Sequence, residues 1–297
     1  MERKVFFVKY WDKGSTSIGA DQMAPALERL GVDARVIYAD SLSKIRDALL
    51  VFIKRADLRH LIEAGARGNR RVLDVQDTVV FRRWISHWMF YDGVIFRNRR
   101  QLQDFAPRQA LSRTISQHWD PRYQPHRAGA DRLRVAYLGI PRSLDLWGRI
   151  PEVEFLGPSD WFEGAREFNA HLSVRHTHRE WLYKPNAKVA TAAACEAVLI
   201  TTPDCASVEL LGEDYPFYLA GSDAESIRKG LDFARSRFGG PEWHEALARL
   251  RALKPALSLD RVAAQYLEMF RELDFERPAR RVPAAPRALL GRGRRAG

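Results

Sequence analysis

Short apolar runs alternate with amphipathic stretches along most of the chain. In the first third, runs of four or five apolar residues predict buried strands, and stretches with apolar residues three or four positions apart predict helices. The predicted strands cover residues 5–8, 34–38, 49–53, 71–75, 93–96 and 112–115. The predicted helices cover residues 20–30, 43–47, 58–66, 80–89 and 100–105. Strands and helices that alternate in this way are typical of a parallel, doubly wound sheet.

A segment rich in proline, glycine and charge interrupts this alternation at residues 118–132 and predicts a linker. The alternation then begins again. The predicted strands cover residues 135–138, 153–156, 170–174, 198–201 and 216–219, and the predicted helices 186–194, 207–211, 224–236, 242–253 and 259–273. We therefore expect an α/β protein of two Rossmann-like domains, 1–117 and 133–275, whose doubly wound parallel sheets face a central cleft.

The composition agrees with a soluble protein of this size. Apolar residues make up 46% of the 297, which is enough for two buried cores. The longest apolar runs are too short to span a membrane, and the first run, 5–8, predicts a strand and not a signal peptide. Cys195 and Cys205 are too few for a disulfide framework. We therefore expect a cytoplasmic protein.

Much of the positive charge lies at the end of the chain. Residues 276–297 carry seven arginines and one glutamate, which is +6 of the net +11. Such a tail, rich in proline, alanine and glycine, cannot bury enough apolar surface to fold. It is expected to be a solvated, disordered segment, with weak contact to the inner face of an anionic membrane as the alternative. The rest of the chain is only mildly basic, so no specific nucleic-acid binding is expected.

The most informative segment covers residues 180–203. A polar turn, Lys184-Pro185-Asn186, precedes a helix rich in alanine, and the helix leads into the strand 198–201. Alanines let a helix lie close to a sheet, and its N-terminus then presents free N–H groups that suit a diphosphate. Lys188 lies in the first turn, where a cation opposes the helix dipole unless an anion lies between them. A solvated lysine on a structural helix is the alternative.

This segment resembles the donor-binding region of group-1 glycosyltransferases of the GT-B fold. The resemblance rests on Lys184-Pro185-Asn186-x-Lys188, on the strand and exit loop 198–203, and on the helix that starts at Ser207. It covers about residues 170–231. The family pattern has two glutamates around this helix and a glycine after it. Alignment on Cys195 places Tyr183 and Thr191 at the glutamates and Glu196 at the glycine, which implies a variant that binds the diphosphate mainly by charge.

The resemblance implies roles for particular residues. Basic residues at strand ends would neutralise the leaving diphosphate, since arginine can bind two of its oxygens at once. The implied nucleotide-sugar-binding residues of the second domain are Arg142, Arg175, Lys184, Asn186, Lys188, Thr191, Thr202 and Glu209. Surface charge is the alternative for each arginine. Thr191 would donate a hydrogen bond to the ribose, and Glu209 would hold the ribose or complement a helix dipole.

In the first domain the resemblance places the loop 13–19 at the donor–acceptor cleft. Gly14 and Gly19 would permit close approach of the backbone, or simply form a strand-to-helix turn. Asp77 follows the fourth strand and could accept a proton from an acceptor hydroxyl, or cap the next helix. His118 is a second candidate catalytic residue. His176 and His178 alternate on a segment taken as extended, so no metal site is expected.

The resemblance therefore implies a glycosyltransferase that needs neither metal nor cofactor. It would move a hexose from a nucleotide-sugar donor to a hydroxyl acceptor, such as a glycan or a lipid-linked precursor in bacterial surface polysaccharide synthesis. The second domain would hold the nucleotide and the first the acceptor. Two alternatives remain at this point: a catalytically silent homologue that binds a nucleotide or acts as a scaffold, and an enzyme that epimerises nucleotide sugars.

Overall fold

The computed structural model describes residues 4–12, 14–77, 87–127, 131–139 and 150–275. It divides into two compact units. Unit 1 holds the described residues of Met1–Phe96 and Gln101–Ile115 and the chain from Ala263, and unit 2 holds Arg97–Arg100 and those of Ser116–Val262. The predicted basic tail, 276–297, and most of the predicted helix 80–89 lie outside the described residues.

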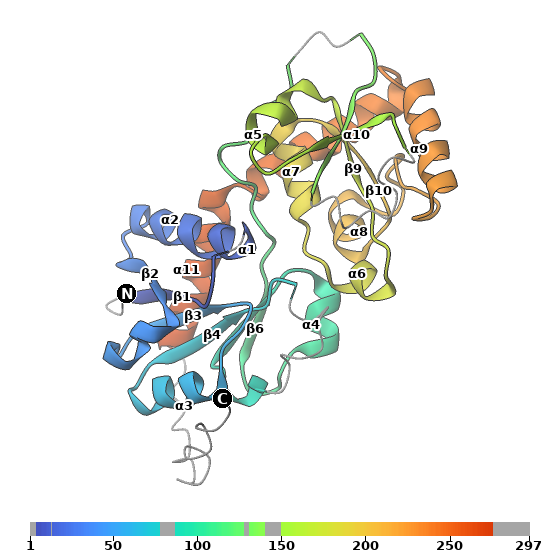
Figure 1. Cartoon of the computed structure of the whole chain (residues 1–297). Helices are drawn as coiled ribbons and strands as arrows, with labels where there is room; N and C mark the ends of the chain where they lie inside the picture. The colour runs from blue at the N-terminus through green and yellow to red at the C-terminus, as the bar shows by residue number, and fades with distance from the viewer. Residues whose placement is uncertain (1–3, 13, 78–86, 128–130, 140–149, 276–297) are drawn as a thin grey trace, which may run out of the picture. The chain divides into compact units, whose positions relative to one another are not determined.

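Unit 1 is built on a six-stranded parallel sheet with the order β2-β1-β3-β4-β5-β6 (Figure 1). The strands are β1 (Val5–Lys9), β2 (Ala34–Tyr38), β3 (Leu49–Ile53), β4 (Arg70–Asp74), β5 (Gly93–Phe96) and β6 (Leu111–Thr114). The helical segments are α1 (Gly14–Thr16), η1 (Ser17–Gln22), α2 (Met23–Arg29), η2 (Ala39–Lys44), α3 (Leu58–Ala66), α4 (Arg99–Phe105) and α11 (Leu259–Phe275). Strands β1, β3, β4 and β5 are buried throughout, as expected for a parallel sheet covered on both faces.

Helices cover both faces of this sheet, with α2 and α11 on one face and α3 on the other (Figure 1). Side chains of β4 form hydrogen bonds with helices on both faces. Asp74 accepts a hydrogen bond of 2.8 Å from the Tyr266 hydroxyl on α11. Arg71 points to the opposite face, where its guanidinium donates to the Leu61 carbonyl on α3 at 3.4 Å. Residues three apart on a strand face opposite sides, so one strand binds both helical layers.

The last helix, α11, differs from the expectation, which placed residues 259–273 in the second domain. From Ala263 it belongs to unit 1, where the Tyr266 ring contacts Phe7 on β1 and Leu273 lies against Gly93 on β5. The sequence predicted the helix and its apolar face. An apolar stripe fits any apolar sheet face, so periodicity does not say which sheet a helix covers.

Unit 2 contains a four-stranded parallel sheet with the order β10-β9-β7-β8. The strands are β7 (Val135–Leu138), β8 (Val153–Leu156), β9 (Ala170–Ser173) and β10 (Val198–Thr201). The helical segments are α5 (Trp161–Gly164), η6 (Ala165–Glu167), α6 (His178–Tyr183), α7 (Ala187–Cys195), α8 (Cys205–Leu211), α9 (Ala224–Ser236) and α10 (Pro241–Ala256). The two parallel sheets confirm the predicted fold class.

Two local expectations in unit 2 were wrong. The predicted strand 216–219 forms only a single parallel bridge, from Thr201 to Tyr218, and the N–H of Leu199 donates to the Tyr215 hydroxyl instead of to a further carbonyl of this segment. The segment of the two histidines is not extended throughout, because a helix begins at His178. Thr177 and Glu180 form a reciprocal capping box there. The spacing Thr-x-x-Glu is the sequence signal that would have predicted this helix start.

Glu196 ends α7 in the left-handed region, at φ 52°, where the resemblance expected glycine. Its carboxylate accepts from Arg251 Nε and Lys254 Nζ on α10, each at 2.9 Å. These two cations lower the pKa of Glu196, and Lys254 has the larger effect. An acid whose pKa is lowered by folding stabilises the fold above its unfolded pKa, and this stabilisation is lost as the pH falls through the folded value.

We therefore expect Glu196→Gln to lower the free energy of unfolding by about 0.5–1 kcal/mol at pH 7. The difference from the unsubstituted protein should be smaller at pH 3 than at pH 7, because acid shifts the carboxyl toward its protonated form. Urea unfolding at the two pH values measures it. A loss of equal size at pH 7 and pH 3 would mean that packing, and not charge, holds this helix end.

Candidate functional site

The candidate site lies at the carboxyl edge of the unit 2 sheet, between β7 and β9. The chain passes from β7 to β8 on one side and then returns to β9 on the other side of β7. In open α/β sheets ligands bind outside the strand ends at such a switch point, because the two connections diverge there and leave a crevice. The strands end here at Leu138 and Ser173, and the N-terminus of α7 lies at the same edge of the sheet.

Lys188 connects α7 to the end of β7. It lies in the first turn of the helix, and its ammonium donates a hydrogen bond to the carbonyl oxygen of Leu138. The ammonium lies 5.7 Å from the centre of the Tyr137 ring. The Lys188 side chain can span the distance from α7 to β7 because the helix lies close to the sheet. Its residues Ala190, 192–194 and Cys195 are buried. The alanine-rich helix thus places a cation at the strand end.

The electrostatics around Lys188 disfavour its own charge. Although the side chain as a whole is partly exposed, its ammonium lies among protein atoms. This burial, with smaller contributions from Arg175 and Lys184, lowers the pKa of Lys188 to about 7. None of the carboxylates in the described parts of the chain forms an ion pair with it, and its hydrogen-bond acceptor is a neutral carbonyl. A diphosphate beside this ammonium would supply the missing negative charge.

Arg175, which follows β9, is held in place from two sides. Its backbone N–H donates to Thr202 Oγ1 at 3.1 Å, and its Nε donates to Asp204 Oδ2 at 3.3 Å. Asp204 is 1% exposed and also caps α8 by accepting from the Ser207 N–H at 3.0 Å. Burial raises the pKa of Asp204, while Arg175 acts in the opposite direction. The side chain of Arg175 is 14% exposed, so it is fixed and yet reachable.

The side chain of Asn186 occupies the N-cap position of α7 but does not cap the helix. It instead exchanges two hydrogen bonds with the backbone of Gln117: Oδ1 accepts at 2.9 Å and Nδ2 donates at 3.2 Å. No other side chain of the described residues caps this end. The first N–H groups of α7 are therefore available to a ligand, as a diphosphate site requires.

Three further predicted residues, Thr191, Glu209 and Lys184, form hydrogen bonds within the protein. Thr191 Oγ1 donates to the Ala187 carbonyl within α7 at 2.9 Å, which uses its one hydroxyl proton. Glu209 lies inside α8, and its carboxylate accepts from the Arg99 N–H at 2.7 Å. Asn98 donates to the carbonyl of Lys184 at 3.1 Å. The ribose contacts of Thr191 and Glu209 stay predictions.

The structure brings Arg175, Lys184, Lys188 and Thr202 to one edge of unit 2, and Arg142 lies outside the described residues. Sequence reasoning missed Asp204, although an Asp three residues before Ser207 is a capping signal at the start of a helix. It also missed Tyr137, whose ring lies against the ammonium. Tyr137 lies in the continuous apolar run Val135–Leu138, which indicates a buried strand but gives no sign of a ligand.

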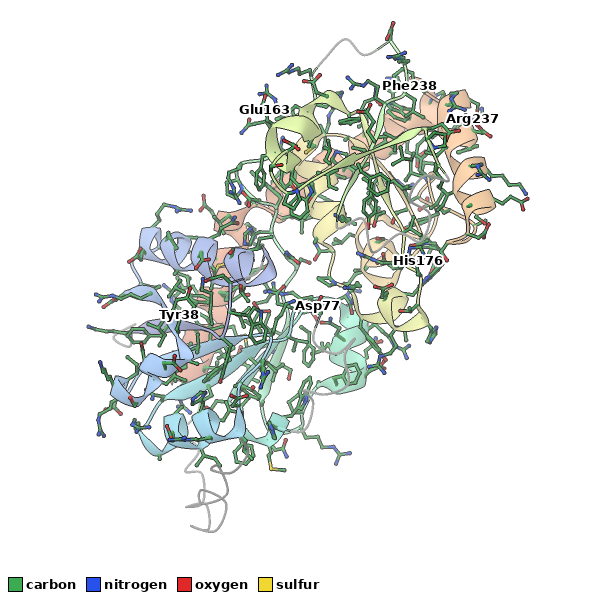
Figure 2. The ribbon with its side chains drawn as sticks, in the orientation of Figure 1. Tyr38, Asp77, Glu163, His176, Arg237 and Phe238 are labelled. Carbon is green, nitrogen blue, oxygen red and sulfur yellow. The ribbon has the colours of Figure 1, made fainter. Side chains whose placement is uncertain are left out.

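The other predicted residues lie at the carboxyl edge of the unit 1 sheet and on the connecting segment. Gly14 is exposed at the start of α1, while Gly19 is buried, with the Gln76 amide only 3.1 Å from where a Cβ would lie. Asp77, which is labelled in Figure 2, pairs with Lys54 at 2.7 Å. His118 is buried in unit 2, with Nδ1 2.8 Å from the Trp119 carbonyl oxygen.

Neither a metal-binding cluster nor a membrane-spanning helix is found among the residues that the structure describes. They contain no group of three or more His, Cys, Asp or Glu that could hold a metal ion. They also contain no helix with the length and apolar character needed to pass through a bilayer.

Solved structures of other proteins share this architecture. A glycosyltransferase from Rickettsia africae superposes with a TM-score of 0.68 over 93% of this chain and 100% of its own, at 10% identity. The chain has the GT-B fold. Anabaena Alr3699/HepE, solved in complex with UDP-glucose, aligns with this GT-B chain at a TM-score of 0.63, at 10% identity, over 91% of it and 99% of HepE.

A viral protein shares the GT-B fold as well. T4 phage BGT, solved with its UDP-glucose substrate, reaches a TM-score of 0.55 at 12% identity, over 91% of this chain and 99% of its own. No protein-family model matches the sequence, and no curated protein matches it either. The recognition of a GT-B protein from residues 170–231 is thus confirmed by three-dimensional structure, at a sequence identity that shows the fold alone.

Proposed function

We propose that this protein transfers a sugar from a nucleotide-sugar donor to a hydroxyl acceptor. The observation that carries the proposal is the pair of cations, Lys188 and Arg175, at the switch point of the unit 2 sheet. Solved structures of the same fold that contain UDP or UDP-glucose support a nucleotide-sugar donor. They favour transfer over the silent nucleotide-binding protein.

In this proposal unit 2 holds the donor. Its diphosphate would meet the N–H groups of α7, the ammonium of Lys188 and the guanidinium of Arg175. Negative charge grows on the diphosphate as the bond to the sugar breaks, and fixed cations stabilise that charge without reorganisation. The two cations would therefore do what a bound metal ion does in other enzymes, and the transfer is proposed to be metal-independent.

Unit 1 is proposed to hold the acceptor, a glycan or lipid-linked hydroxyl. Asp77 is the proposed base. Its carboxylate is oriented by an ion pair with Lys54 and is the group proposed to accept the proton of the attacking hydroxyl. Hexose as the transferred group is part of the same proposal. Hydrolysis and transfer assayed across a panel of nucleotide sugars, with EDTA present and absent, test these points. Activity only with an added divalent metal would contradict the metal-independent reaction.

The low pKa of Lys188 gives a direct test of donor binding. A bound diphosphate favours the charged ammonium, so binding takes up a proton above pH 7, and affinity falls as the pH rises from 6 to 8.5. UDP-glucose suits this test because its diphosphate is ionised throughout the range. We expect Lys188→Met to weaken binding roughly 10- to 100-fold at pH 6, the value of a charge-assisted hydrogen bond.

Calorimetry in buffers of different ionisation enthalpy measures both the affinity and the proton uptake. In the free protein the lowered pKa means that stability is lost as the pH falls from about 10.5, the unfolded value, toward 7, and the full loss is present below about pH 7. Lys188→Met should therefore raise the unfolding free energy at pH 6 while it weakens binding. A variant that binds UDP-glucose as tightly as the unsubstituted protein, with the same pH dependence, would remove Lys188 from the donor site.

A further inference from the structure

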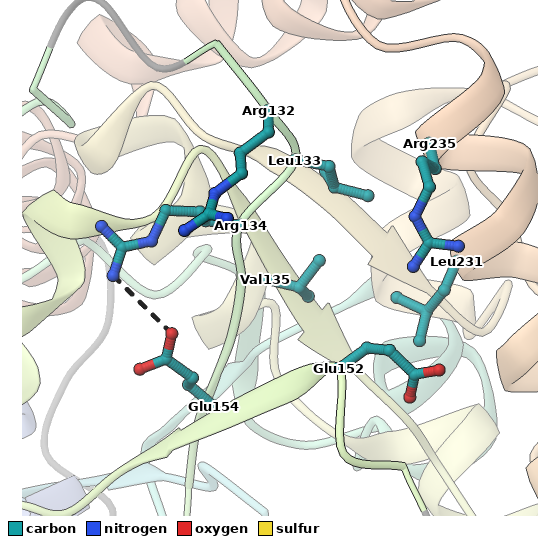
Figure 3. A pocket seen from close by; sticks show the side chains of 8 residues that line it. All are labelled: Arg132, Leu133, Arg134, Val135, Glu152, Glu154, Leu231 and Arg235. Atoms are coloured by element: carbon teal, nitrogen blue, oxygen red, sulfur yellow. Dashed lines mark ion pairs between the residues drawn. The ribbon is translucent and has the colours of Figure 1, made fainter.

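A pocket opens at the opposite end of the unit 2 sheet from the candidate donor site, where β7 and β8 begin. It has a volume of about 240 Å³, and its lining residues are Arg132, Leu133, Arg134, Val135, Glu152, Glu154, Leu231 and Arg235 (Figure 3). Val135 is the first residue of β7, whereas the hydrogen bond of Lys188 lies at the last residue of that strand. The pocket is therefore separate from the proposed donor site.

The charged groups of the pocket are only partly matched. Arg134 pairs with Glu154 at 3.6 Å and lies over the Phe168 ring at 4.8 Å, so it is already occupied. Arg235 contacts Asp232 at 2.6 Å on its own helix, an exposed pair that a ligand can exchange with little loss. Within the described ranges, the side chains of Arg132 and Glu152 form no ion pair. The pocket thus offers two guanidinium groups and one carboxylate to a ligand.

The floor of the pocket is aliphatic. Val135 and Leu231 are buried and Leu133 is partly buried between the charged groups. Figure 3 shows the side chains of Leu133 and Val135 between those of Arg132 and Arg235. A pocket of about 240 Å³ is smaller than the roughly 300–1,000 Å³ that drug-sized ligands fill, so it suits a molecule of about one ring.

We propose that this pocket binds an acidic monosaccharide unit, a uronate. Arginine pairs with a carboxylate through two parallel hydrogen bonds, which Arg132 or Arg235 can supply. The free carboxylate of Glu152 accepts hydrogen bonds from sugar hydroxyls, and the C–H face of the ring rests on the aliphatic floor. Glu152 also discriminates between anions, because it repels a doubly charged phosphate more strongly than a singly charged carboxylate.

The test is titration of the full-length protein with sodium glucuronate, glucose and inorganic phosphate, followed by NMR or calorimetry. We expect saturable binding of glucuronate with a dissociation constant of about 1 mM, with glucose and phosphate each at least roughly tenfold weaker. The double variant Arg132→Ala/Arg235→Ala should weaken glucuronate binding roughly tenfold or more, since it removes charge-assisted bonds. Lys229→Ala, which removes an exposed cation of α9 outside the pocket, is the matched control and should bind as the unsubstituted protein does.

Glu152→Gln separates charge from hydrogen bonding. It should keep most of the glucuronate affinity, because the amide oxygen still accepts a hydroxyl, and it should strengthen phosphate binding. Phosphate that binds the unsubstituted protein as tightly as glucuronate would overturn the uronate assignment. Binding that is unchanged in the double variant, or no saturable binding of glucuronate, would overturn the site. UDP-glucose affinity, measured in parallel, reports the donor site independently of this pocket.

Discussion

Replacing Asp92 with alanine is expected to lower the free energy of unfolding by about 3–5 kcal/mol. Asp92 and Arg71 form an ion pair inside unit 1, with side chains 5% and 2% exposed. One carboxylate oxygen accepts from Arg71 Nε at 3.1 Å and from the Arg71 backbone N–H at 2.9 Å. The other accepts from the second guanidinium nitrogen at 3.3 Å. Removal of the acid leaves a guanidinium charge buried without its partner.

Urea unfolding followed by circular dichroism measures this loss. Lys229→Ala is the control, because it breaks an ion pair with Glu225 on α9 in which both side chains are about three-quarters exposed. The control should change stability by less than about 0.5 kcal/mol. The double variant Arg71→Met/Asp92→Leu should recover much of the loss, because it removes both charges. An Asp92→Ala protein as stable as the control would contradict the assigned role of the pair.

The second large effect is expected on catalysis. Arg175→Ala should lower kcat for sugar transfer by about 10²- to 10³-fold, the usual cost of one donor to a developing negative charge. Its backbone bond to Thr202 does not depend on the side chain, so the strand end should keep its conformation. The substitution leaves Asp204 without its cation in a buried position, and a moderate loss of stability is expected with it.

Two variants separate these effects. Asp204→Asn keeps the helix cap through its side-chain oxygen and removes the acid beside Arg175, so it should retain more activity than Arg175→Ala. Arg251→Ala removes a cation at the other end of α7, where it pairs with Glu196, and should leave kcat unchanged. Single-turnover assays with the donor found in the panel give kcat. Equal losses in Arg175→Ala and Arg251→Ala would mean that general charge, and not this position, supports the reaction.

Both unit 2 cations are held in position by the protein before any ligand binds. The backbone of Arg175 is tied to Thr202 and its side chain to the cap of α8, while Lys188 is tied to the last carbonyl of β7. Lys188 therefore has its direction set before any ligand binds, yet it pays for burial with a pKa near neutrality. A site that is already oriented loses little entropy on binding, so the energy of the diphosphate contact is available for affinity and catalysis.

The candidate site was only partly visible in the sequence. Lys188 in the first turn of an alanine-rich helix was evident, because a cation there opposes the helix dipole. The hydrogen-bond partner of Asn186 was not evident, since an asparagine before a helix normally caps that helix. Gln117, 69 positions earlier, takes its side chain instead. Such a contact depends on where the connecting segment runs, and no local pattern records that.

What the sequence determined by itself is the alternation of strands and helices and, through it, two parallel sheets. Each depends on hydrophobic periodicity, which is local. The tertiary structure alone decided that α11 joins the unit 1 sheet, that Asp204 pairs with Arg175, and that the Lys188 ammonium is buried enough for its pKa to fall to about 7. The physical reason is that burial and pairing depend on distances between residues far apart in the chain, and these are set only when helices and sheets pack.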